Sequence, residues 1–402
     1  MLNESLDSGP GGFDFQPRTR LCFGVNSIER VGELAGELGA RSILVVTDPG
    51  IVIAGHAQRV EHILQASGLG VVIFDQVREN PTTRDVDNCL KAAKAAGIDT
   101  IVGLGGGSSI DTAKGCNFLL TNGGRMQDYR GTGKATRPML PLIAIPTTAG
   151  TGSECQSFAL IADEHTHMKM ACGDPKAAAR IAILDPALTV SQPPRVTACT
   201  GIDAMAHAVE TAVTTTRNAL SRVYSHEAFK LTITSLARVL HDPNDLEARG
   251  RMLLGAAFAG TAIENSMLGA AHAAANPLTA HFNIVHGQAV GLMLPLVVRF
   301  NSADPAAKRA YAELASAPEL ACVSDGVEEA CLALIARLES MLNLAGLPRS
   351  LADCGVKQAE IPRLAGEAAK QWTAGFNPRP VAVADFVKLY EAGFKPRGDG
   401  DG

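Results

Sequence analysis

The sequence predicts two kinds of structure in succession, an α/β domain built on a parallel sheet and then an all-helical domain. Between residues 20 and 190, short apolar runs alternate with helix-like segments. This pattern is typical of a parallel sheet covered by helices on both faces. After about residue 190, long stretches rich in Ala, Leu and Glu replace the β-branched runs. A chain of 402 residues is also too long to fold around one small hydrophobic core. We therefore expect two domains, 1–190 and 191–402.

Five apolar runs are the expected strands of the parallel sheet. They are residues 42–47, 70–74, 100–104, 142–145 and 181–184. The helices expected between them are 28–38, 53–67, 84–96 and 109–120. Such sheets bind ligands beyond the carboxyl ends of their strands, and the glycines of the first half gather there.

The second half of the chain predicts helices with almost no β-branched runs between them. They are residues 203–216, 219–239, 245–264, 326–345, 357–371 and 382–392. The domain boundary is expected near Pro186 to Pro194, a segment with three prolines. The first dozen residues and 397–402 are expected to be frayed.

Composition excludes several classes of function. A net charge of -5 gives no basic surface for nucleic acid or membrane lipid, and 4% aromatic residues argue against stacking platforms. The nine cysteines form no CxxC pair, so they indicate reduced residues of a cytoplasmic protein. We find neither a signal peptide nor a membrane-spanning run.

A glycine-rich loop, GLGGGSSIDTAK at 103–114, follows an expected strand and opens an expected helix. Gly105, Gly106 and Gly107 would let a phosphate approach the backbone, where the helix N-terminus supplies N–H groups and a favourable dipole. Ser108 or Ser109 is the expected N-cap. The loop is not a GxGxxG match, and a plain tight turn is the alternative, but its position between strand and helix favours phosphate binding.

Two neighbouring features favour a dinucleotide. Asp48 follows the strand at 42–47, where an acidic residue commonly accepts hydrogen bonds from an adenosine ribose and repels a 2′-phosphate, which favours NAD over NADP. The alternative is a turn aspartate before Pro49-Gly50. The loop PTTAGTGSE at 146–154 carries small hydroxyl residues and two glycines after a strand, as a loop in close contact with a cofactor would.

The best candidates for metal ligands lie in the second half. In GIDAMAHAVE at 201–210, Asp203 and His207 are four residues apart and share one face of a helix. A carboxylate and an imidazole that converge suit iron or zinc. His272 and His286, in a Gly- and Ala-rich stretch, are candidates for the remaining ligands. The alternative for Asp203 and His207 is a solvated or core-capping pair on an amphipathic helix. The alternative for the two histidines is a core histidine whose hydrogen bonds are satisfied.

Taken together, these motifs resemble the iron-containing (group III) alcohol dehydrogenases. The matching segments, in order, are GGGSSID at 105–111, PTTAGTGSE at 146–154, TGIDAMAHAVE at 200–210 and the His272/His286 pair. The resemblance runs from about residue 20, through Asn80-Pro-Thr82, to Asn377-Pro-Arg379. It implies a Rossmann-like first domain and a helical second domain, the fold shared with dehydroquinate synthase, with the active site in the cleft between them.

The resemblance also assigns roles to residues. It implies that Asp203, His207, His272 and His286 hold the metal. It implies cofactor contacts, besides the glycines of the loop, at Asp48, Asn80, Gly106, Gly107, Ser108, Asp111, Thr147, Thr148, Lys169 and Leu188. Several members carry a histidine for proton transfer where this chain has Asn276, which cannot titrate. His281 and a water chain are the two expected substitutes.

The resemblance implies an NAD-dependent alcohol dehydrogenase or aldehyde reductase. The metal is expected to be Fe²⁺, which keeps a position open beside four protein ligands, with Zn²⁺ as the alternative. Small apolar neighbours of the ligands favour a short, uncharged alcohol or aldehyde, and we expect a homodimer or larger homo-oligomer. The rival functions are a maleylacetate reductase-like enzyme, a dehydroquinate synthase-like lyase and a non-catalytic NAD-binding or shell protein. The candidate segments 201–210 and 269–287 contain no Lys or Arg for an acidic lyase substrate.

Overall fold

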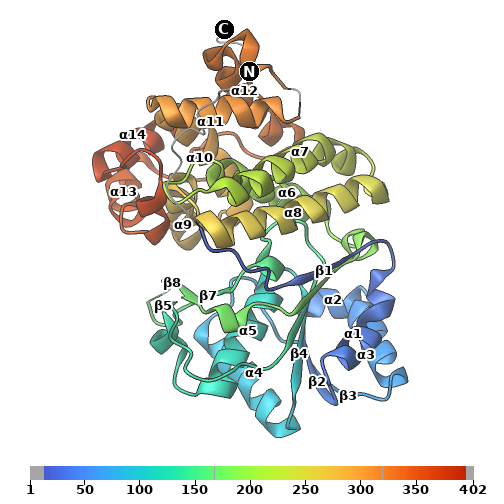
Figure 1. The fold of residues 1–402 in the computed structure, drawn as a ribbon. Helices are drawn as coiled ribbons and strands as arrows, with labels where there is room; N and C mark the ends of the chain where they lie inside the picture. The colour runs from blue at the N-terminus through green and yellow to red at the C-terminus, as the bar shows by residue number, and fades with distance from the viewer. Residues whose placement is uncertain (1–12, 167, 319, 395–402) are drawn as a thin grey trace. The chain divides into compact units, whose positions relative to one another are not determined.

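The structure, a computed structural model, describes residues 13–166, 168–318 and 320–394. These residues form two compact units (Figure 1). The sheet unit consists of residues 16–193 and 244–260. The helical unit contains residues 13–15, 194–243 and the described residues after 260. The chain ends that the sequence predicts to be frayed lie outside the described ranges.

The sheet unit is built on a six-stranded parallel sheet with the strand order β1-β9-β6-β4-β2-β3. Its strands are β1 (Arg20–Phe23), β2 (Ser42–Val46), β3 (Gly70–Phe74), β4 (Thr100–Gly105), β6 (Leu142–Pro146) and β9 (Ile181–Leu184). The five expected strands are confirmed. The chain leaves β2 toward β3 but β4 toward β6, so the strand order reverses between β2 and β4, where open α/β sheets bind their ligands.

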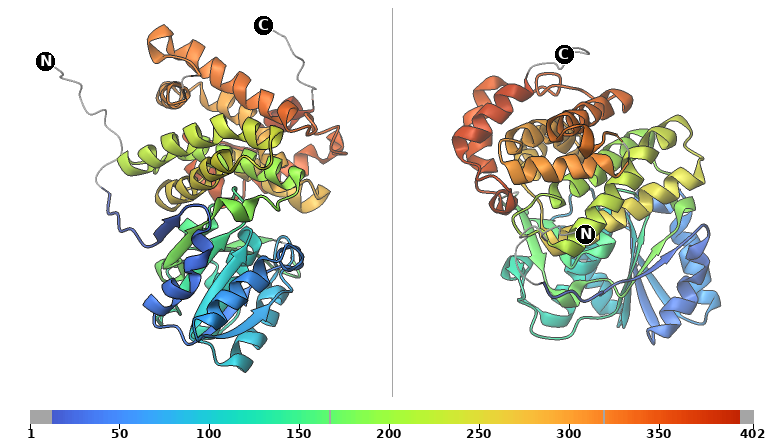
Figure 2. Two further views of the ribbon diagram at one scale, coloured as in Figure 1. Left: turned by 90° about the vertical axis from the view of Figure 1, so that its right-hand side faces the viewer. Right: turned by 45° about the horizontal axis from the view of Figure 1, so that its top comes forward.

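Helices cover both faces of this sheet, as Figures 1 and 2 show. They are α1 (Val31–Glu37), α2 (Pro49–Ile53), α3 (His56–Ala66), α4 (Thr83–Ala96) and α5 (Gly107–Asn122). Ile43 and Val45 of β2 pack in the core with α1 and α3, whereas Leu44 and Val46 pack with α4 and α5. Because successive side chains of a strand point to opposite faces, burial on both sides requires the continuous apolar runs seen in the sequence.

The short strands of the sheet unit were not expected from the sequence. Strand β1 forms one edge of the large sheet, and β5 (Gly131–Thr132), β7 (Phe158–Ala162) and β8 (Lys169–Gly173) form a separate three-stranded sheet. Strands β7 and β8 are antiparallel, with Ala162 opposite Lys169. Strands β5 and β8 contain Gly, Thr or Lys and lack the continuous apolar run that predicted the other strands.

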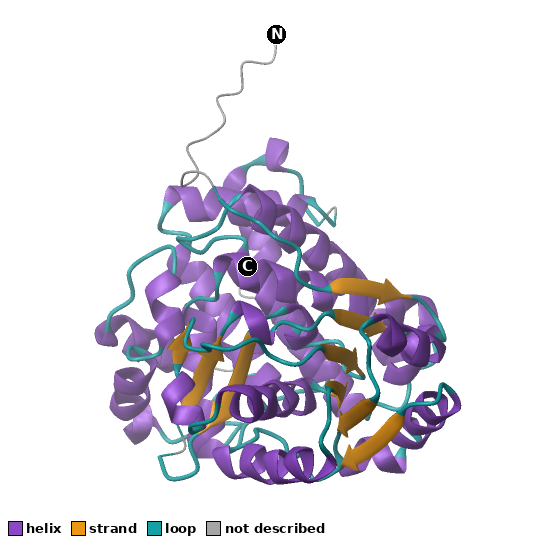
Figure 3. Ribbon diagram, turned by 60° about the horizontal axis from the view of Figure 1, so that its bottom comes forward, coloured by secondary structure: helices purple, strands orange, loops and turns teal. Residues whose placement is uncertain are grey.

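The helical unit contains no strand among its described residues (Figure 3). Its helices are α6 (Pro194–Thr211), α7 (Ala219–His241), α8 (Leu246–Ser266), α9 (Ala270–Phe282), α10 (His286–Asn301), α11 (Pro305–Ser316), α12 (Val327–Leu344), α13 (Ile361–Ala368) and α14 (Val383–Gly393). Part of α8, up to Gly260, clusters with the sheet unit although its sequence resembles the other helices. None of the described helices combines the length and apolar character needed to cross a membrane.

Three helices of this unit, α9, α10 and α11, are absent from the sequence-based prediction. Proline interrupts the helical pattern within α9 at Pro277 and within α10 at Pro295. An interior proline removes one backbone hydrogen bond, so it normally argues against a helix. Both helices are heavily buried, and tertiary packing therefore outweighs the local preference.

Candidate metal centre and glycine-loop site

Helix α6 carries Asp203 and His207 on one face, one turn apart, as the spacing predicts. His207 Nε2 lies 3.6 Å from Asp203 Oδ1. Both side chains are buried, which argues against a solvated surface pair. The helix begins at Pro194, in the segment expected to be the domain boundary, because proline suits the first turn of a helix.

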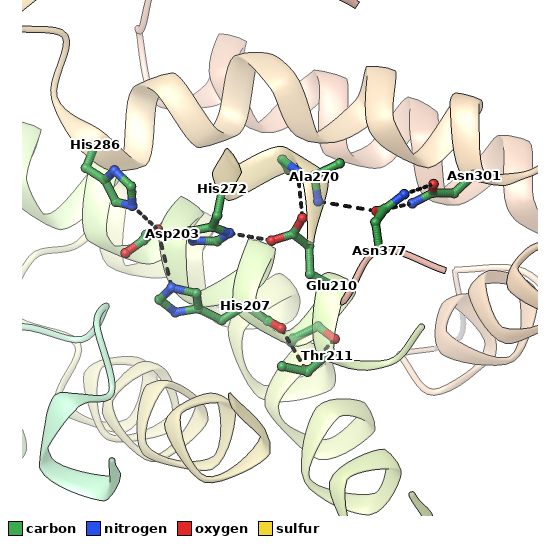
Figure 4. Close-up of polar contacts among 11 residues, drawn as sticks. Asp203, His207, Glu210, Thr211, Ala270, His272, His286, Asn301 and Asn377 are labelled. Atoms are coloured by element: carbon green, nitrogen blue, oxygen red, sulfur yellow. Dashed lines mark hydrogen bonds and ion pairs between the residues drawn. The ribbon is translucent and has the colours of Figure 1, made fainter. Parts of the chain in front are cut away.

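Two further helices bring His272 and His286 to the same place. His272 is the third residue of α9, and His286 is the first residue of α10. His272 Nε2 lies 3.4 Å from Asp203 Oδ1, and His286 Nε2 lies 3.9 Å from the same atom. The rings of His207 and His272 are stacked with their centroids 4.8 Å apart. Figure 4 shows the four side chains pointing toward one another.

Ligand atoms of Asp203, His207 and His272 all lie within 4.8 Å of one another, as a shared metal ion requires. His286 extends this group on its more accessible side, with 25% of its side chain exposed. The three distances to Asp203 Oδ1 exceed an ordinary hydrogen bond. Two ligand atoms at about 2.1 Å from one tetrahedral ion stand about 3.4 Å apart. The spacing therefore suits ligands of a common cation.

Two buried atoms of this group, Asp203 Oδ1 and His272 Nε2, have no hydrogen-bond partner within the described residues. Such an atom costs about 1–3 kcal/mol when it stays unsatisfied. A cation among the four side chains would satisfy both atoms. One carboxylate with imidazoles is a donor set that suits iron or zinc, so the residues present fit a divalent first-row metal.

The charges of the centre also favour a cation. Burial acts to raise the pKa of the Asp203 carboxyl, but the imidazoles of His207, His272 and His286 hold it well below its ordinary value. Burial acts to lower the pKa of His272, but the Glu210 and Asp203 carboxylates outweigh burial and raise it to about 9. Metal binding at this centre therefore competes with protonation of an imidazole.

Glu210 belongs to the centre, although sequence reasoning did not single it out. It lies two turns after Asp203 on the same face of α6, and it is buried. Its Oε2 contacts His272 Nδ1, and its Oε1 accepts a hydrogen bond from Ala271 N at 2.7 Å. Its spacing of three residues from His207 indicates that the two side chains share a face of α6. Only the position of α9 identifies His272 as the partner of Glu210.

His281 does not join the group. It lies nine residues after His272, which directs it toward the opposite face of α9. Its Nε2 is 2.6 Å from Glu367 Oε2. The side chain of His281 is 30% exposed and that of Glu367 is 38% exposed. Asn276, one turn after His272, donates a hydrogen bond to Gln371 Oε1 at 3.1 Å. A relay through His281 therefore has no support in this geometry, and a water chain is the remaining expectation.

The glycine-rich loop joins β4 to α5, as predicted. Gly105 ends β4 with φ +141°, which favours glycine. The N-cap is Gly106, so the expectation of Ser108 or Ser109 in this role is wrong. A Cβ at Gly107 would lie 2.7 Å from Thr151 Cγ2, and one at Gly106 would lie 3.4 Å from Thr148 Cγ2. The loop after β6 therefore lies directly against the glycines.

Asp48 lies beside this loop at the carboxyl end of β2. Its Oδ1 accepts a hydrogen bond from Ile51 N at 3.2 Å and caps α2, in agreement with the alternative of a turn aspartate. Its Oδ2 also accepts a hydrogen bond from Ser109 Oγ at 3.3 Å and would lie 3.1 Å from a Cβ at Gly105. Asp48 and the glycines thus flank the point where the strand order reverses, so the capping role and a ribose-binding role are compatible.

The other predicted cofactor contacts are more dispersed within the sheet unit. Thr147 is buried and donates from its N to Gly105 O at 3.0 Å. Lys169 is the first residue of β8, and Asn80 is exposed with φ +53°. The side chain of Leu188 is buried in the core of the sheet unit, its N donates a hydrogen bond to Asp185 O at 3.1 Å, and its O accepts one from Ser191 Oγ at 3.2 Å.

Asp111, also a predicted contact, is held inside the sheet unit. Its Oδ1 accepts a hydrogen bond from Ser153 Oγ at 2.6 Å, and its Oδ2 accepts one from Leu160 N at 3.1 Å. Lys114, to which the sequence assigned no role, is fully buried and donates from Nζ to Ser153 O at 2.7 Å. Burial raises the pKa of Asp111, and Lys114 opposes this. The network ties α5 to the loop after β6.

Glu154, in the same loop, is a buried acid that sequence reasoning did not assign. It is 1% exposed, and its Oε1 has no hydrogen-bond partner among the described residues. Burial raises the pKa of this carboxyl from 4.5 to about 7, although its own backbone N–H and Lys114 act in the opposite direction. Between these two pH values the unfolded chain loses this proton while the folded protein keeps it, so stability falls as pH rises.

We expect Glu154→Gln to gain stability over the wild type as pH rises from about 5 to about 7. Below about pH 4.5 both states of the wild type are protonated, and above about pH 7 the folded protein bears the full penalty, on the order of 3 kcal/mol. Thermal unfolding from about pH 5 to about pH 8 measures this, with the exposed Glu79→Gln as the control. A difference from the wild type that does not change with pH would contradict the expectation.

Comparisons with known proteins identify the family to which this chain belongs. The model of the iron-containing alcohol dehydrogenase family matches residues 17–186, and that of the C-terminal part of the Fe-containing alcohol dehydrogenase family matches 197–394. Alcohol dehydrogenase 4 of Schizosaccharomyces pombe is 36% identical over 89% of this chain and 83% of its own length.

Solved structures are similar over nearly the whole chain. A 1,3-propanediol oxidoreductase superimposes with a TM-score of 0.92 and 31% identity over 96% of this chain and 100% of its own. Sulfoacetaldehyde reductase from Bifidobacterium kashiwanohense, in complex with NAD⁺, has a TM-score of 0.85 and 25% identity over 95% of this chain and 99% of its own.

Proposed function

Because this chain belongs to the iron-containing alcohol dehydrogenase family and is an oxidoreductase, we propose that it transfers a hydride between NAD and a short alcohol or aldehyde held at the centre on α6, α9 and α10. The observation that carries the proposal is the convergence of Asp203, His207, His272 and His286 with two buried atoms unsatisfied.

The four side chains would hold Fe²⁺, with Zn²⁺ as the alternative. When bound, the metal would polarise the substrate oxygen and stabilise negative charge on it. With neutral imidazoles, the Asp203 carboxylate and the Glu210 carboxylate behind His272 leave the centre negatively charged, so it attracts a divalent ion. Burial of three of the ligands excludes water from the inner side of the centre, which strengthens its electrostatic interactions.

The carboxyl ends of β2, β4 and β6 would hold the dinucleotide. Gly106, the N-cap of α5, and Gly107, its first residue, stand at a helix N-terminus, whose first backbone N–H groups and dipole suit a pyrophosphate. The Asp48 carboxylate would accept hydrogen bonds from the ribose and repel a 2′-phosphate, which supports NAD over NADP. A sulfoacetaldehyde reductase of similar fold is known with NAD⁺ bound, which also supports this choice.

The proposed substrates are primary alcohols and the corresponding aldehydes. Two similar proteins, a 1,3-propanediol oxidoreductase and a sulfoacetaldehyde reductase, are named for a primary alcohol and for an aldehyde respectively. Small apolar residues next to the ligands, such as Ala204 and Met205, support a short, uncharged chain. The absence of Lys and Arg from 201–210 and 269–287 speaks against a lyase with a polyanionic substrate.

We also propose a cytoplasmic homo-oligomer. All nine cysteines are free, in keeping with a reducing compartment. Strand β1, at the edge of the large sheet, exposes Leu21 and Phe23, and exposed apolar edge strands favour pairing with a second copy.

The proposed function is tested by an NADH-linked screen of primary alcohols and aldehydes of about two to eight carbon atoms, on protein loaded with Fe²⁺ and analysed for metal. We expect steady NADH production from an alcohol, its loss on chelation, and recovery with Fe²⁺. With NADP in place of NAD, the rate should be lower by at least about tenfold. Turnover that survives complete metal removal would contradict the proposed mechanism, and a single enzyme-bound redox cycle without net NADH would favour the lyase.

A further inference from the structure

Glu210 is placed to determine the tautomer of a metal ligand. Its two carboxylate oxygens are both engaged, Oε2 by His272 Nδ1 and Oε1 by Ala271 N. A carboxylate can only accept hydrogen bonds, so Nδ1 of His272 must carry the proton. The lone pair of the neutral ring is then on Nε2, the buried atom that faces Asp203 and has no hydrogen-bond partner among the described residues.

Asn377 holds the same turn of α9 from another side. The first N–H groups of a helix have no partner within the helix, and Gly269, the N-cap of α9, has no side chain to supply one. Instead, Asn377 Oδ1 accepts a hydrogen bond from Ala270 N at 3.2 Å. A Cβ at Gly269 would lie 3.0 Å from both Asn377 Oδ1 and Glu210 Oε1. The turn that carries His272 is therefore held between these two side chains.

The contacts continue to the far end of α10. Asn301, the last residue of that helix, exchanges two hydrogen bonds with Asn377, at 2.7 and 3.1 Å. The second N–H of Asn377 donates to Arg379 O at 2.7 Å, and that of Asn301 donates to Tyr311 OH at 3.0 Å. Every N–H of the two amides is thus used, and a saturated buried network of this kind is geometrically unique.

The network links the three helices that carry the metal ligands. Glu210 extends from α6, the first turn of α9 donates hydrogen bonds to both Glu210 and Asn377, and Asn301 ends α10, whose first residue is His286 (Figure 4). A network that served only to stabilise the fold would have no reason to end on a ligand nitrogen. A shift of any of the three helices would instead be felt at the metal centre.

We propose that Glu210 and Asn377 are positioning residues of the metal centre: Glu210 keeps Nε2 of His272 free for the ion, and Asn377 with Asn301 fixes the turn that presents it. This inference rests on the proposed function, because it presumes that the four side chains bind a metal. Outer partners of this kind typically change metal affinity by about 10- to 100-fold.

The test is Glu210→Gln, which keeps the shape of the side chain. Glutamine has only one acceptor oxygen, whereas two N–H groups, those of Ala271 and His272, each need an acceptor. The amide –NH₂ must then face either Ala271 N–H or His272 Nδ1. In the second case Nδ1 becomes the acceptor, and the proton moves to Nε2, which blocks the metal. We expect the Kd of the metal-free protein for Co²⁺, measured by chelator competition at a temperature where the variant is folded, to rise by about 10- to 100-fold.

The visible absorption spectrum of bound Co²⁺ separates positioning from stability. A purely structural role would lower the melting temperature and leave both the Kd and the spectrum unchanged, whereas the proposed role changes the Kd and the spectrum of the folded protein. Glu391→Gln, an exposed change of the same type on α14, should match the wild type in all readings. Equal Co²⁺ affinity of Glu210→Gln and wild type would overturn the proposal.

Asn377→Asp tests the outer part of the network independently and serves if Glu210→Gln is insoluble. It replaces an –NH₂ by an oxygen that would face the oxygens of Asn301 and Arg379. We expect several-fold weaker Co²⁺ binding and an altered spectrum, and unchanged binding would overturn the part assigned to Asn377. A wild type that binds no Co²⁺ would instead refute the proposed function itself.

Discussion

Replacement of His272 by alanine is expected to abolish alcohol oxidation and metal retention while NAD still binds. The change removes a buried ligand atom 3.4 Å from Asp203 Oδ1 and leaves Glu210 without its imidazole partner. A bound metal contributes several kcal/mol to charge stabilisation in the transition state, so kcat should fall by at least about a thousandfold. All predicted cofactor contacts lie in the sheet unit and His272 lies in the helical unit, so the Kd for NAD should change by less than about twofold.

Three measurements check this expectation: NADH formation, metal content after dialysis against a chelator, and NAD binding by calorimetry. His286→Ala is expected to give the same result, because its Nε2 also faces Asp203 Oδ1. The control is His241→Ala, an exposed histidine at the end of α7, which should retain wild-type activity and metal. Metal-dependent turnover in both His272→Ala and His286→Ala would remove the metal mechanism.

The parts of the site that the sequence could predict are those determined within one element. Asp203 and His207 share a face of α6 because of their spacing alone, and the glycine loop stands between a strand and a helix that each have a clear pattern. The parallel sheet was equally predictable, since its continuous apolar strands are a direct consequence of burial on both faces.

The contacts between elements could not be predicted in this way. Glu210 is one of several acids on helices, and only the position of α9 reveals that it faces His272. Distance along the sequence is a poor guide to contact in this part of the site, as His281 and Asn377 show. His281 lies near His272 in sequence but on another face of α9, whereas Asn377 lies more than a hundred residues away and contacts the same turn. Pro277 and Pro295 made α9 and α10 look non-helical in the sequence, because proline disfavours a helix interior. Tertiary packing overrides this local preference in the folded protein.

A second large effect is expected from Gly287→Ala, a change that touches no ligand. Gly287 follows His286 in the first turn of α10, and a Cβ there would lie 1.9 Å from the backbone oxygen of Cys199 and 2.6 Å from its carbonyl carbon. Cys199 lies one turn before Asp203 on α6. Because backbone atoms cannot turn aside as a side chain does, α6 and α10 must separate by about 1 Å or more.

That separation should be visible in both stability and metal binding. His286 Nε2 already lies 3.9 Å from Asp203 Oδ1, so a further shift would take it out of range of a shared ion. We expect a loss of about 3 kcal/mol in the free energy of unfolding, or roughly 10 °C in the melting temperature, for a unit of this size. Calorimetry and chelator competition measure the two effects.

Two other glycines of the helical unit provide a graded comparison. At Gly291, one turn further along α10, a Cβ would meet Ile202 Cγ2 at 2.8 Å and Leu342 Cδ2 at 3.1 Å, which are side-chain atoms that can move. At Gly366, in α13, a Cβ would meet nothing within 4 Å, so Gly366→Ala should be neutral or stabilise the helix by up to about 1 kcal/mol. The loss should therefore grow from Gly366→Ala through Gly291→Ala to Gly287→Ala, and metal affinity should collapse only in the last. If Gly287→Ala instead kept the wild-type melting temperature and metal content, the direct contact of α6 with α10 would not be what sets the spacing of the ligands.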